Sequence, residues 1–273
     1  MRHKYLLLVF TLLTSFGSAT VSAAIFSQDT IFNQRDNSYR KQGFWRKKYP
    51  NGKLAYKGYF KDDKPRGIFT RYHEDGTLLA EMVFNNTGNK AQVKLYYSGG
   101  YKVAAEGTYL NEKKDSTWKY FAPDKRLVFQ ENYKNGIKHG DYITYYKSGA
   151  VYEVIPYVNG EIEGDMRQYY PNGQIKTEWT LLNGKQNGKI RSYFSDGTIR
   201  VEGNYKDGIK HGIWSIYNMD RKMVKQTQYI NGFPKNREEE MERETREIEE
   251  MLKNAGQISE PDVQSFFEST GGF

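Results

Sequence analysis

Glutamates recur at regular intervals in this chain, and two neighbouring ones could in principle act as a catalytic pair of carboxylates. Glu81, Glu106, Glu178 and Glu202 occupy one position of a repeating pattern. If that position lies on alternate strands of a sheet, Glu178 and Glu202 would be about 10 Å apart. This is just beyond the separation of the two carboxylates in inverting glycosidases. Pairing with Lys or Arg on the neighbouring strands accounts for such a row, and we predict no catalytic residues and no enzyme activity.

The histidines do not form a metal-binding pattern. His139 and His211 share a Lys-His-Gly position 72 residues apart, and His73 stands beside a tyrosine. No two histidines have the spacing of metal ligands. The chain contains no Cys, which excludes disulfides and thiolate metal sites. Its glycines fall at predicted turns and not in a phosphate-binding loop. We therefore predict no metal and no cofactor.

Aromatic residues form a column that is better suited to binding than to catalysis. Tyrosine is favoured at interfaces because its ring offers rigid apolar area with a polar tip. Successive members would lie about 10 Å apart along a sheet and could hold a peptide, a glycan or lipid headgroups. The alternative is that the rings stack on each other and on an aliphatic stripe. The candidate binding surface is Tyr72, Tyr96, Phe121, Tyr145, Tyr169, Tyr193 and Tyr217.

A repeat of 24 residues must position these side chains. Glycine recurs at Gly140, Gly164, Gly188 and Gly212, and one extra residue in the turn 98–101 shifts the register upstream. Each copy has two short aromatic-rich runs separated by turns, which predicts a β-hairpin. Asn or Asp occupies one column in all eight copies: Asp62, Asn86, Asn111, Asn135, Asn159, Asn183, Asp207 and Asn231.

The turns and the residues after them complete the predicted hairpin. Asn-Gly and Asp-Gly dipeptides accept the positive φ of tight turns. Two copies lack the glycine of this turn and have Asp124-Lys125 and Asp220-Arg221 instead. We expect these two turns to be less tight or to be strained. An apolar residue follows each turn, which predicts a buried stripe: Leu54, Leu78, Val103, Leu127, Val151, Ile175, Ile199 and Met223.

The segment Tyr205–Tyr217, which reads Tyr-Lys-Asp-Gly-Ile-Lys-His-Gly-Ile-Trp-Ser-Ile-Tyr, resembles the MORN repeat. It is most similar to the bacterial MORN-variant repeats of YwqK-type antitoxins, over roughly residues 41–234. The resemblance implies an all-β fold, an elongated antiparallel sheet of about eight stacked β-hairpins that binds proteins or membranes. The motif residues build the hairpin and carry no chemistry of their own.

Four segments are expected along the chain. Residues 1–23 combine a basic start, an apolar stretch and a small-residue cleavage site, which predicts a signal peptide and an exported, periplasmic or secreted protein. Residues 24–41 form an N-terminal cap or linker, in which Ile25, Phe26, Ile31 and Phe32 could pair along the open edge of the first hairpin. The repeats occupy 42–234, and 235–273 form an acidic helix and flexible tail.

The predicted C-terminal helix carries one narrow apolar stripe. Met241, Thr245, Ile248 and Leu252 recur at helical spacing within an acidic segment. We expect this stripe to pack across the last hairpin as a cap, or else to leave the helix solvated or bound to a partner. Val263, Phe266 and Phe267 form a further apolar patch that could dock on the repeats or act as a short linear motif.

The charge is divided unevenly along the chain. Of the net charge of +8, residues 1–23 contribute +2 and residues 235–273 contribute −6, so the repeats carry +12. A basic surface could attract anionic lipid, nucleic acid or an acidic protein, or could simply keep sheet edges and turns soluble. Nucleic acid is the least favoured partner because the basic residues are dispersed through all repeats and the protein is predicted to be exported.

Three functions remain open at this level. The first is an exported, non-enzymatic scaffold that binds another protein in the cell envelope. The second is a YwqK-type antitoxin or immunity protein that neutralises a toxin. The third is binding to an anionic membrane surface through the basic repeats, which salt would abolish.

Overall fold

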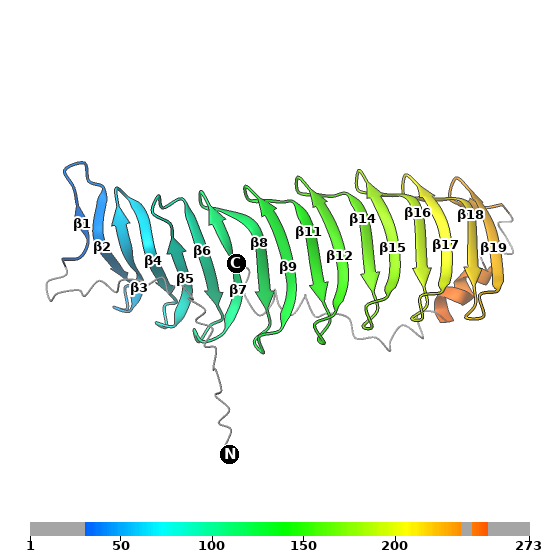
Figure 1. Cartoon of the computed structure of the whole chain (residues 1–273), viewed down its shortest axis with the longest axis horizontal. Coiled ribbons are helices and arrows are strands. Elements are labelled where there is room, and N and C mark those ends of the chain that lie inside the picture. The colour runs from blue at the N-terminus through cyan, green and yellow to red at the C-terminus, as the bar shows by residue number, and fades with distance from the viewer. Residues whose placement is uncertain (1–30, 236–241, 251–273) are drawn as a thin grey trace, which may run out of the picture. The chain divides into compact units, whose positions relative to one another are not determined.

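A computed structural model describes residues 31–235 and 242–250. Residues 32–235 form one antiparallel sheet of 20 strands that does not close on itself, and residues 242–250 form a short helix (Figure 1). Consecutive strands pair along the whole sheet, so every long strand is hydrogen-bonded to the strands before and after it in the sequence. The predicted fold class, an antiparallel sheet of stacked hairpins with a C-terminal helix, is confirmed.

Four of the strands have two residues each, and the other sixteen give eight hairpins. The short ones are β1 (Gln34–Arg35), β10 (Ile137–Lys138), β13 (Glu161–Ile162) and β20 (Phe233–Pro234). The long strands of the first four hairpins are β2 (Lys41–Lys48), β3 (Leu54–Lys61), β4 (Lys64–Tyr72), β5 (Leu78–Phe84), β6 (Lys90–Tyr96), β7 (Val103–Leu110), β8 (Lys113–Phe121) and β9 (Leu127–Lys134). Those of the last four are β11 (Gly140–Tyr145), β12 (Val151–Val158), β14 (Gly164–Tyr169), β15 (Ile175–Leu182), β16 (Lys185–Tyr193), β17 (Ile199–Lys206), β18 (Ile209–Tyr217) and β19 (Met223–Ile230).

The turns follow the predicted chemistry. Asn135 and Gly136 have φ of 54° and 83°, the two positive values that a tight hairpin turn requires. The two departing copies keep the geometry of the others: Lys125 and Arg221 adopt φ of 71° and 62° where the equivalent Gly197 has 83°. These two turns are therefore as tight as the rest, with the strain on a residue that has a Cβ.

The third repeat differs from its neighbours at both of its ends. The turn 98–101 holds the predicted extra residue, because the Tyr97 amide bonds to the Lys102 carbonyl, whereas the Tyr146 amide bonds to Ala150. At the other end of β6, Ala91 takes the position of the repeat glycine, and the pairing of β5 with β6 runs without a bulge. In the neighbouring pair of β3 with β4 the register shifts between Gly58 and Tyr59.

The two faces of the sheet carry different side chains, because alternate residues of a strand point to opposite sides. We call the side that bears Trp45, Trp118, Trp179 and Trp214 the tryptophan face. The other side bears the tyrosine column and a row of charged residues, and we call it the tyrosine face. Cross-strand partners such as Trp214 and Thr227 lie on the same face.

The core lies on the tryptophan face. Trp118 and Phe129 are fully buried, and Val93, Ala105 and Tyr120 are at most 3% exposed. Tyr120 stacks on Phe129 with ring centroids 4.3 Å apart. The prediction that the aliphatic residues after the turns form the buried stripe is wrong: seven of the eight are half-buried, and Met223 is 53% exposed. The larger rings of the opposite face bury more apolar area and make the core there.

Hydrogen bonds from a series of tyrosine hydroxyls connect neighbouring hairpins. Each donates a hydrogen bond to a backbone carbonyl of the next hairpin, 23 or 24 residues along the chain. The distances are 2.8 Å for Tyr49 to Tyr72, 2.7 Å for Tyr97 to Phe121, 2.7 Å for Tyr146 to Tyr169 and 2.7 Å for Tyr170 to Tyr193. The acceptor is in each case a member of the predicted aromatic column, so that column also serves the stacking of repeats.

The two ends of the sheet are partly covered by the chain itself. At the first edge, β1 pairs with β2, and Phe32 forms a parallel bridge with Phe44, as predicted for this segment. At the last edge, β20 pairs with the end of β19. The predicted signal peptide, 1–23, and the apolar patch around Phe266 lie outside the described residues. Within the described residues, no helix has the length and apolar character needed to cross a bilayer.

Candidate binding surfaces

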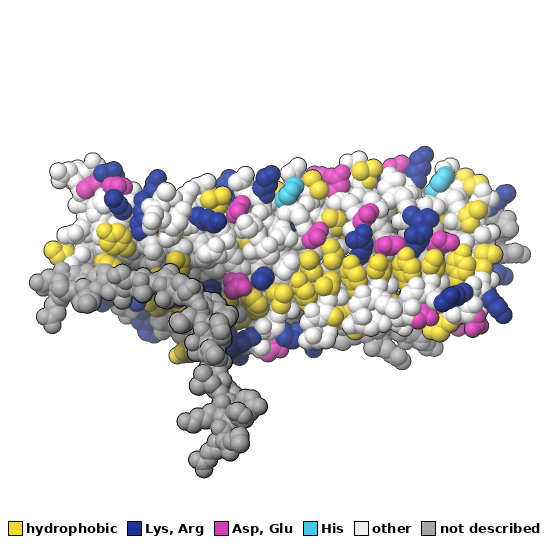
Figure 2. Space-filling model, in the orientation of Figure 1, with side chains coloured by type: hydrophobic (Ala, Val, Ile, Leu, Met, Phe, Trp, Pro, Cys, Tyr) yellow, Lys and Arg dark blue, Asp and Glu magenta, His cyan; other side chains and the backbone are white. Residues whose placement is uncertain are grey.

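The predicted aromatic column lies on the tyrosine face, next to the aliphatic column. The register pairs Tyr145 with Val151, Tyr169 with Ile175, Tyr193 with Ile199 and Tyr217 with Met223. The same pairing joins Tyr72 to Leu78, Tyr96 to Val103 and Phe121 to Leu127. All seven aromatic residues are half-buried. Figure 2 shows a band of hydrophobic side chains that crosses the strands of the later repeats.

The hydroxyls of the later tyrosines are held by the glutamate row. The Tyr193 hydroxyl donates to Glu178 at 2.6 Å, and the Tyr217 hydroxyl donates to Glu202 at 3.0 Å. Burial raises the pKa of Tyr193, and its hydrogen bond to Glu178 raises it further. The rings are thereby fixed in place with their apolar sides along the band.

The glutamates themselves stand in an alternating charged row, as their predicted pairing requires. Arg191 is the cross-strand neighbour of both Glu178 and Glu202, at 3.7 and 3.9 Å. In the earlier repeats the same row reads Glu81, Lys94, Glu106, Lys119, each paired with the next. Every one of these acids therefore has a basic neighbour, and each exposed pair contributes up to about 1 kcal/mol.

His73 and His139 lie on connections between strands, whereas His211 lies within β18, where it pairs with Asn204. His139 and His211 are exposed, and His73 is half-buried at the end of β4. In the part of the chain that the structure describes, no three His, Cys, Asp or Glu side chains are grouped so that they could hold a metal ion.

A second feature, on the tryptophan face, was not predicted from the sequence. The carboxylate of Glu131, which is 6% exposed, accepts a hydrogen bond from the Tyr133 hydroxyl at 2.6 Å and pairs with the Lys138 ammonium at 2.6 Å. Burial raises the pKa of Tyr133 and of Tyr120, and the negative charge of Glu131 adds to both effects.

Lysine ammonium groups lie over aromatic rings on the same face. Lys114 is 4.8 Å from the Trp118 ring centroid and 5.4 Å from that of Tyr133. Burial lowers the pKa of Lys114, while the charge of Glu131 acts in the opposite direction. The lysine position recurs at the start of other repeats: Lys41, Lys138 and Lys210 also lie over rings of their own hairpins. The glycine and aromatic positions of the repeat did not predict these sites. In the sequence, each of these lysines is indistinguishable from the many other basic residues of the repeats.

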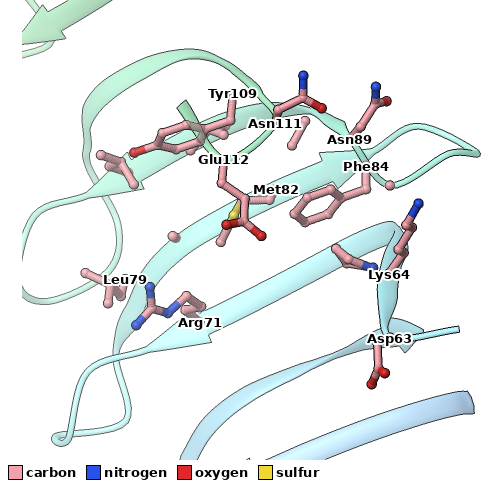
Figure 3. A pocket seen from close by; sticks show the side chains of 16 residues that line it. Asp63, Lys64, Arg71, Leu79, Met82, Phe84, Asn89, Tyr109, Asn111 and Glu112 are labelled. Atoms are coloured by element: carbon pink, nitrogen blue, oxygen red, sulfur yellow. The ribbon is translucent and has the colours of Figure 1, made fainter. Parts of the chain in front are cut away.

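A groove of about 820 Å³ opens on the tryptophan face over β4 to β7 (Figure 3). Met82, Phe84 and Tyr109 line it, with Arg71 toward one end and Lys64 toward the other. It spans the second and third repeats, where the sequence departs from the pattern. Ala80 and Ala91, which line it, occupy positions at which most other repeats carry larger residues or glycine, and these small residues were the signal that could have predicted the groove.

The helix 242–250 contacts the tryptophan face of the last hairpin, and only Thr245 and Ile248 of its predicted apolar stripe lie within the described residues. Ile248 is 55% exposed, and Met241 and Leu252 lie outside the described residues. The contacts run through two carboxylates: Glu244 pairs with Lys210 at 3.3 Å and accepts a hydrogen bond from Tyr229, and Glu247 pairs with Lys225 at 3.8 Å. The contacts described here therefore run from Glu244 and Glu247 to lysines of the last hairpin.

An unclosed sheet in which equivalent hairpins stack side by side defines a repeat protein, whose surfaces are rows of equivalent positions. Five segments match the MORN repeat variant: residues 41–62, 65–86, 138–159, 162–183 and 186–207. These matches support a MORN-repeat protein. The structure shows the same hairpins in residues 87–137 and 208–234, between and after the matched segments.

Other comparisons add little. No curated protein matches the chain. A crystal structure of TarM is 17% identical over 36% of this chain and 19% of that chain, with a TM-score of 0.28. A structure of a S. aureus TarM mutant in complex with Fondaparinux, alpha-GlcNAc-glycerol and UDP is 14% identical over 44% of this chain and 19% of that chain, with a TM-score of 0.22. The chain thus spans about a fifth of the length of both TarM structures.

Proposed function

We propose that this chain is a non-enzymatic scaffold that binds another protein through its tyrosine face. The observation that supports this is the band formed by the tyrosine and aliphatic columns, half-exposed across consecutive hairpins (Figure 2). A contiguous apolar surface of this kind on a water-exposed sheet is typical of an interaction site. Tyrosine rings held by Glu178 and Glu202 would contact a partner with little loss of side-chain freedom.

The charged row beside the band would set the register of the partner. Its acids and bases alternate over β5–β8 and again over β14–β17, so within either stretch a partner displaced by one strand would meet like charges. Most of the row is solvent-exposed or half-buried, and its contribution would be to specificity more than to affinity. A repeat scaffold of this type can extend one binding surface over several hairpins.

We further propose that the protein is exported and acts in the cell envelope. This rests on the sequence of residues 1–23, which lie outside the described residues. Expression of the full chain followed by N-terminal sequencing of the secreted or periplasmic form tests it. A mature N-terminus near Ala24 is expected, and an intact Met1 would contradict it.

Affinity capture with a matched control tests the binding surface. The first bait is the chain from Ala24, and the second carries Tyr145, Tyr169, Tyr193 and Tyr217 changed to Leu. The control carries Tyr39→Leu and Tyr101→Leu, whose rings are 78% and 93% exposed and lie outside the band. A protein held by the first bait and the control but lost from the second is the expected result. Retention by all three would contradict the proposal.

The identity of the captured protein separates the narrower functions. A toxin would support the YwqK-type antitoxin or immunity role, and an envelope component would support a scaffold. Liposomes containing anionic lipid test the third function, since binding through the +12 charge of the repeats must collapse as salt rises.

A further inference from the structure

The last hairpin contains an aromatic-lysine site equivalent to one in the middle of the sheet. Lys210 lies 4.8 Å from the Trp214 centroid and 4.7 Å from that of Tyr229, as Lys114 lies over Trp118 and Tyr133. The two sets of residues are 96 residues apart, which is four repeats. Trp214 and Tyr229 are 9% and 4% exposed, so the rings are part of the fold and present a fixed surface to the lysine.

The two sites differ in the source of their negative charge. In the middle of the sheet the acid is Glu131, which stands two residues before Tyr133 on β9 and is buried. In the last hairpin the same position is Thr227, which is uncharged and 5% exposed. The strands of the last hairpin therefore provide the ammonium of Lys210 and the hydroxyl of Tyr229, but no carboxylate at the position of Glu131.

Helix 242–250 delivers the missing carboxylate. Glu244 lies 34 residues beyond Lys210, pairs with it at 3.3 Å and accepts the Tyr229 hydroxyl. Glu131 likewise accepts the hydroxyl of Tyr133, but its ion pair is with Lys138 of the next hairpin. Glu247, three residues on, pairs with Lys225, whose side chain is only 9% exposed. Residues three apart lie on one face of a helix, so a single helix face satisfies both lysines.

The described contacts of this helix with the sheet are polar. Ile248 is 55% exposed, and both carboxylates are about one-third exposed. Ion pairs of this exposure contribute about 0–1 kcal/mol each. A helix held mainly in this way can leave the sheet at modest cost, whereas Lys225 would then remain largely buried and without its carboxylate.

We propose that Lys210, Lys225 and Tyr229 form a receptor for acidic helices with two carboxylates three residues apart, and that helix 242–250 is its intramolecular occupant. The partner is an acidic helix of another protein, which binds by displacing the tail. Tethering raises the effective concentration of the occupant, so the receptor discriminates against weak competitors. This receptor lies on the face opposite the tyrosine band and does not depend on the function proposed for that band.

Titration of a labelled peptide into the full chain tests the proposal. The peptide has the sequence of residues 236–254, and fluorescence anisotropy at about 20 mM salt gives its Kd. In the chain with Glu244→Gln and Glu247→Gln the intramolecular occupant is weakened, and we expect at least tenfold tighter peptide binding than in the unmodified chain. Adding Lys210→Gln and Lys225→Gln should remove that gain, and higher salt should weaken binding in all variants.

Two further variants keep the test decisive. Lys222→Gln changes an exposed lysine of the same hairpin and should leave binding unchanged. Thr227→Glu in the Glu244→Gln, Glu247→Gln background places an acid where Glu131 stands in the fourth repeat, and should close the receptor to the peptide. Peptide binding that survives Lys210→Gln and Lys225→Gln, or no binding to the vacated chain with its circular dichroism intact, would overturn the proposal. Changing Tyr145, Tyr169, Tyr193 and Tyr217 to Leu on the opposite face should not alter the Kd of the peptide.

Discussion

The indole ring of Trp214 lies against the backbone of Gly203, where a Cβ would be 2.3 Å from the ring. The same contact joins Gly107 to Trp118, and Gly58 to the ring of Phe69. In two other pairs the earlier strand carries the larger side chain: Met82 faces Val93, and Trp179 faces Ile190. Each of these five pairs thus keeps one large residue, because close-packed interiors tolerate neither two overlapping rings nor a void.

Gly203→Ala should lower the free energy of unfolding by about 1–3 kcal/mol, because the ring of Trp214 must move away from the new methyl group. Urea denaturation measures the change. The matched control is the same substitution in a Trp214→Ile background, where the cost should fall below about 1 kcal/mol because Ile leaves room for a Cβ. Equal costs in both backgrounds would show that the ring is not the cause.

Lys125→Gly and Arg221→Gly should each stabilise the protein. Both positions have positive φ, which costs a residue with a Cβ about 1–2 kcal/mol, while glycine loses more freedom on folding. We expect a net gain of about 0.5–1 kcal/mol for each in urea denaturation. Gly197→Lys, the reverse change at the equivalent turn, should be destabilising, and a neutral result at all three turns would argue against strain.

The tyrosine hydroxyls that join neighbouring hairpins should matter more than exposed ones. Tyr146→Phe and Tyr170→Phe each leave a carbonyl of the next hairpin without its donor, and we expect a loss of about 1 kcal/mol apiece. Thermal unfolding followed by circular dichroism measures it. Tyr39→Phe, at a ring that is 78% exposed, is the control and should change stability little.

Docking of helix 242–250 should be lost in acid. Burial acts to raise the pKa of Glu244, but the hydrogen bond from Tyr229 and the charge of Lys210 prevail, so its pKa lies below the ordinary 4.5. A carboxylate with a lowered pKa stabilises the docked state above its ordinary pKa, and this contribution disappears as pH falls through the lowered value. The groups that meet in this contact are Glu244, Glu247, Lys210, Lys225 and Tyr229.

Spin labels report this release directly, since the chain has no native Cys. With Ile248→Cys and Lys222→Cys labelled, we expect a narrow distance distribution at pH 6 that broadens as the pH falls below 4.5. Glu244→Gln should already be broader at pH 6 and should respond less to acid. A distribution that is unchanged between pH 6 and pH 3 would contradict the assignment of the contact to Glu244.

The sequence by itself determined the hairpin, its period and its turns. Asn135-Gly136 and Gly212 act through the conformation of their own backbone. The alternation of side chains along each strand is also local. Turns and strand alternation can therefore be predicted without knowledge of the fold. The pairing of the glutamate row with Arg191 followed from the same register. The arrangement of the aromatic column in a row across the strands followed too.

Only the tertiary structure decided which face is buried and what the charged tail contacts. The aliphatic stripe and the tryptophan rows are equally periodic in sequence, and burial depends on how their volumes fit across strands, as Gly203 and Trp214 show. The receptor at Lys210 joins residues of two strands to a helix 34 residues away, and its sheet residues match an internal site that holds Glu131. The helix occurs once, whereas the hairpins repeat every 24 residues. A contact between the two therefore does not appear as a repeating pattern in the sequence.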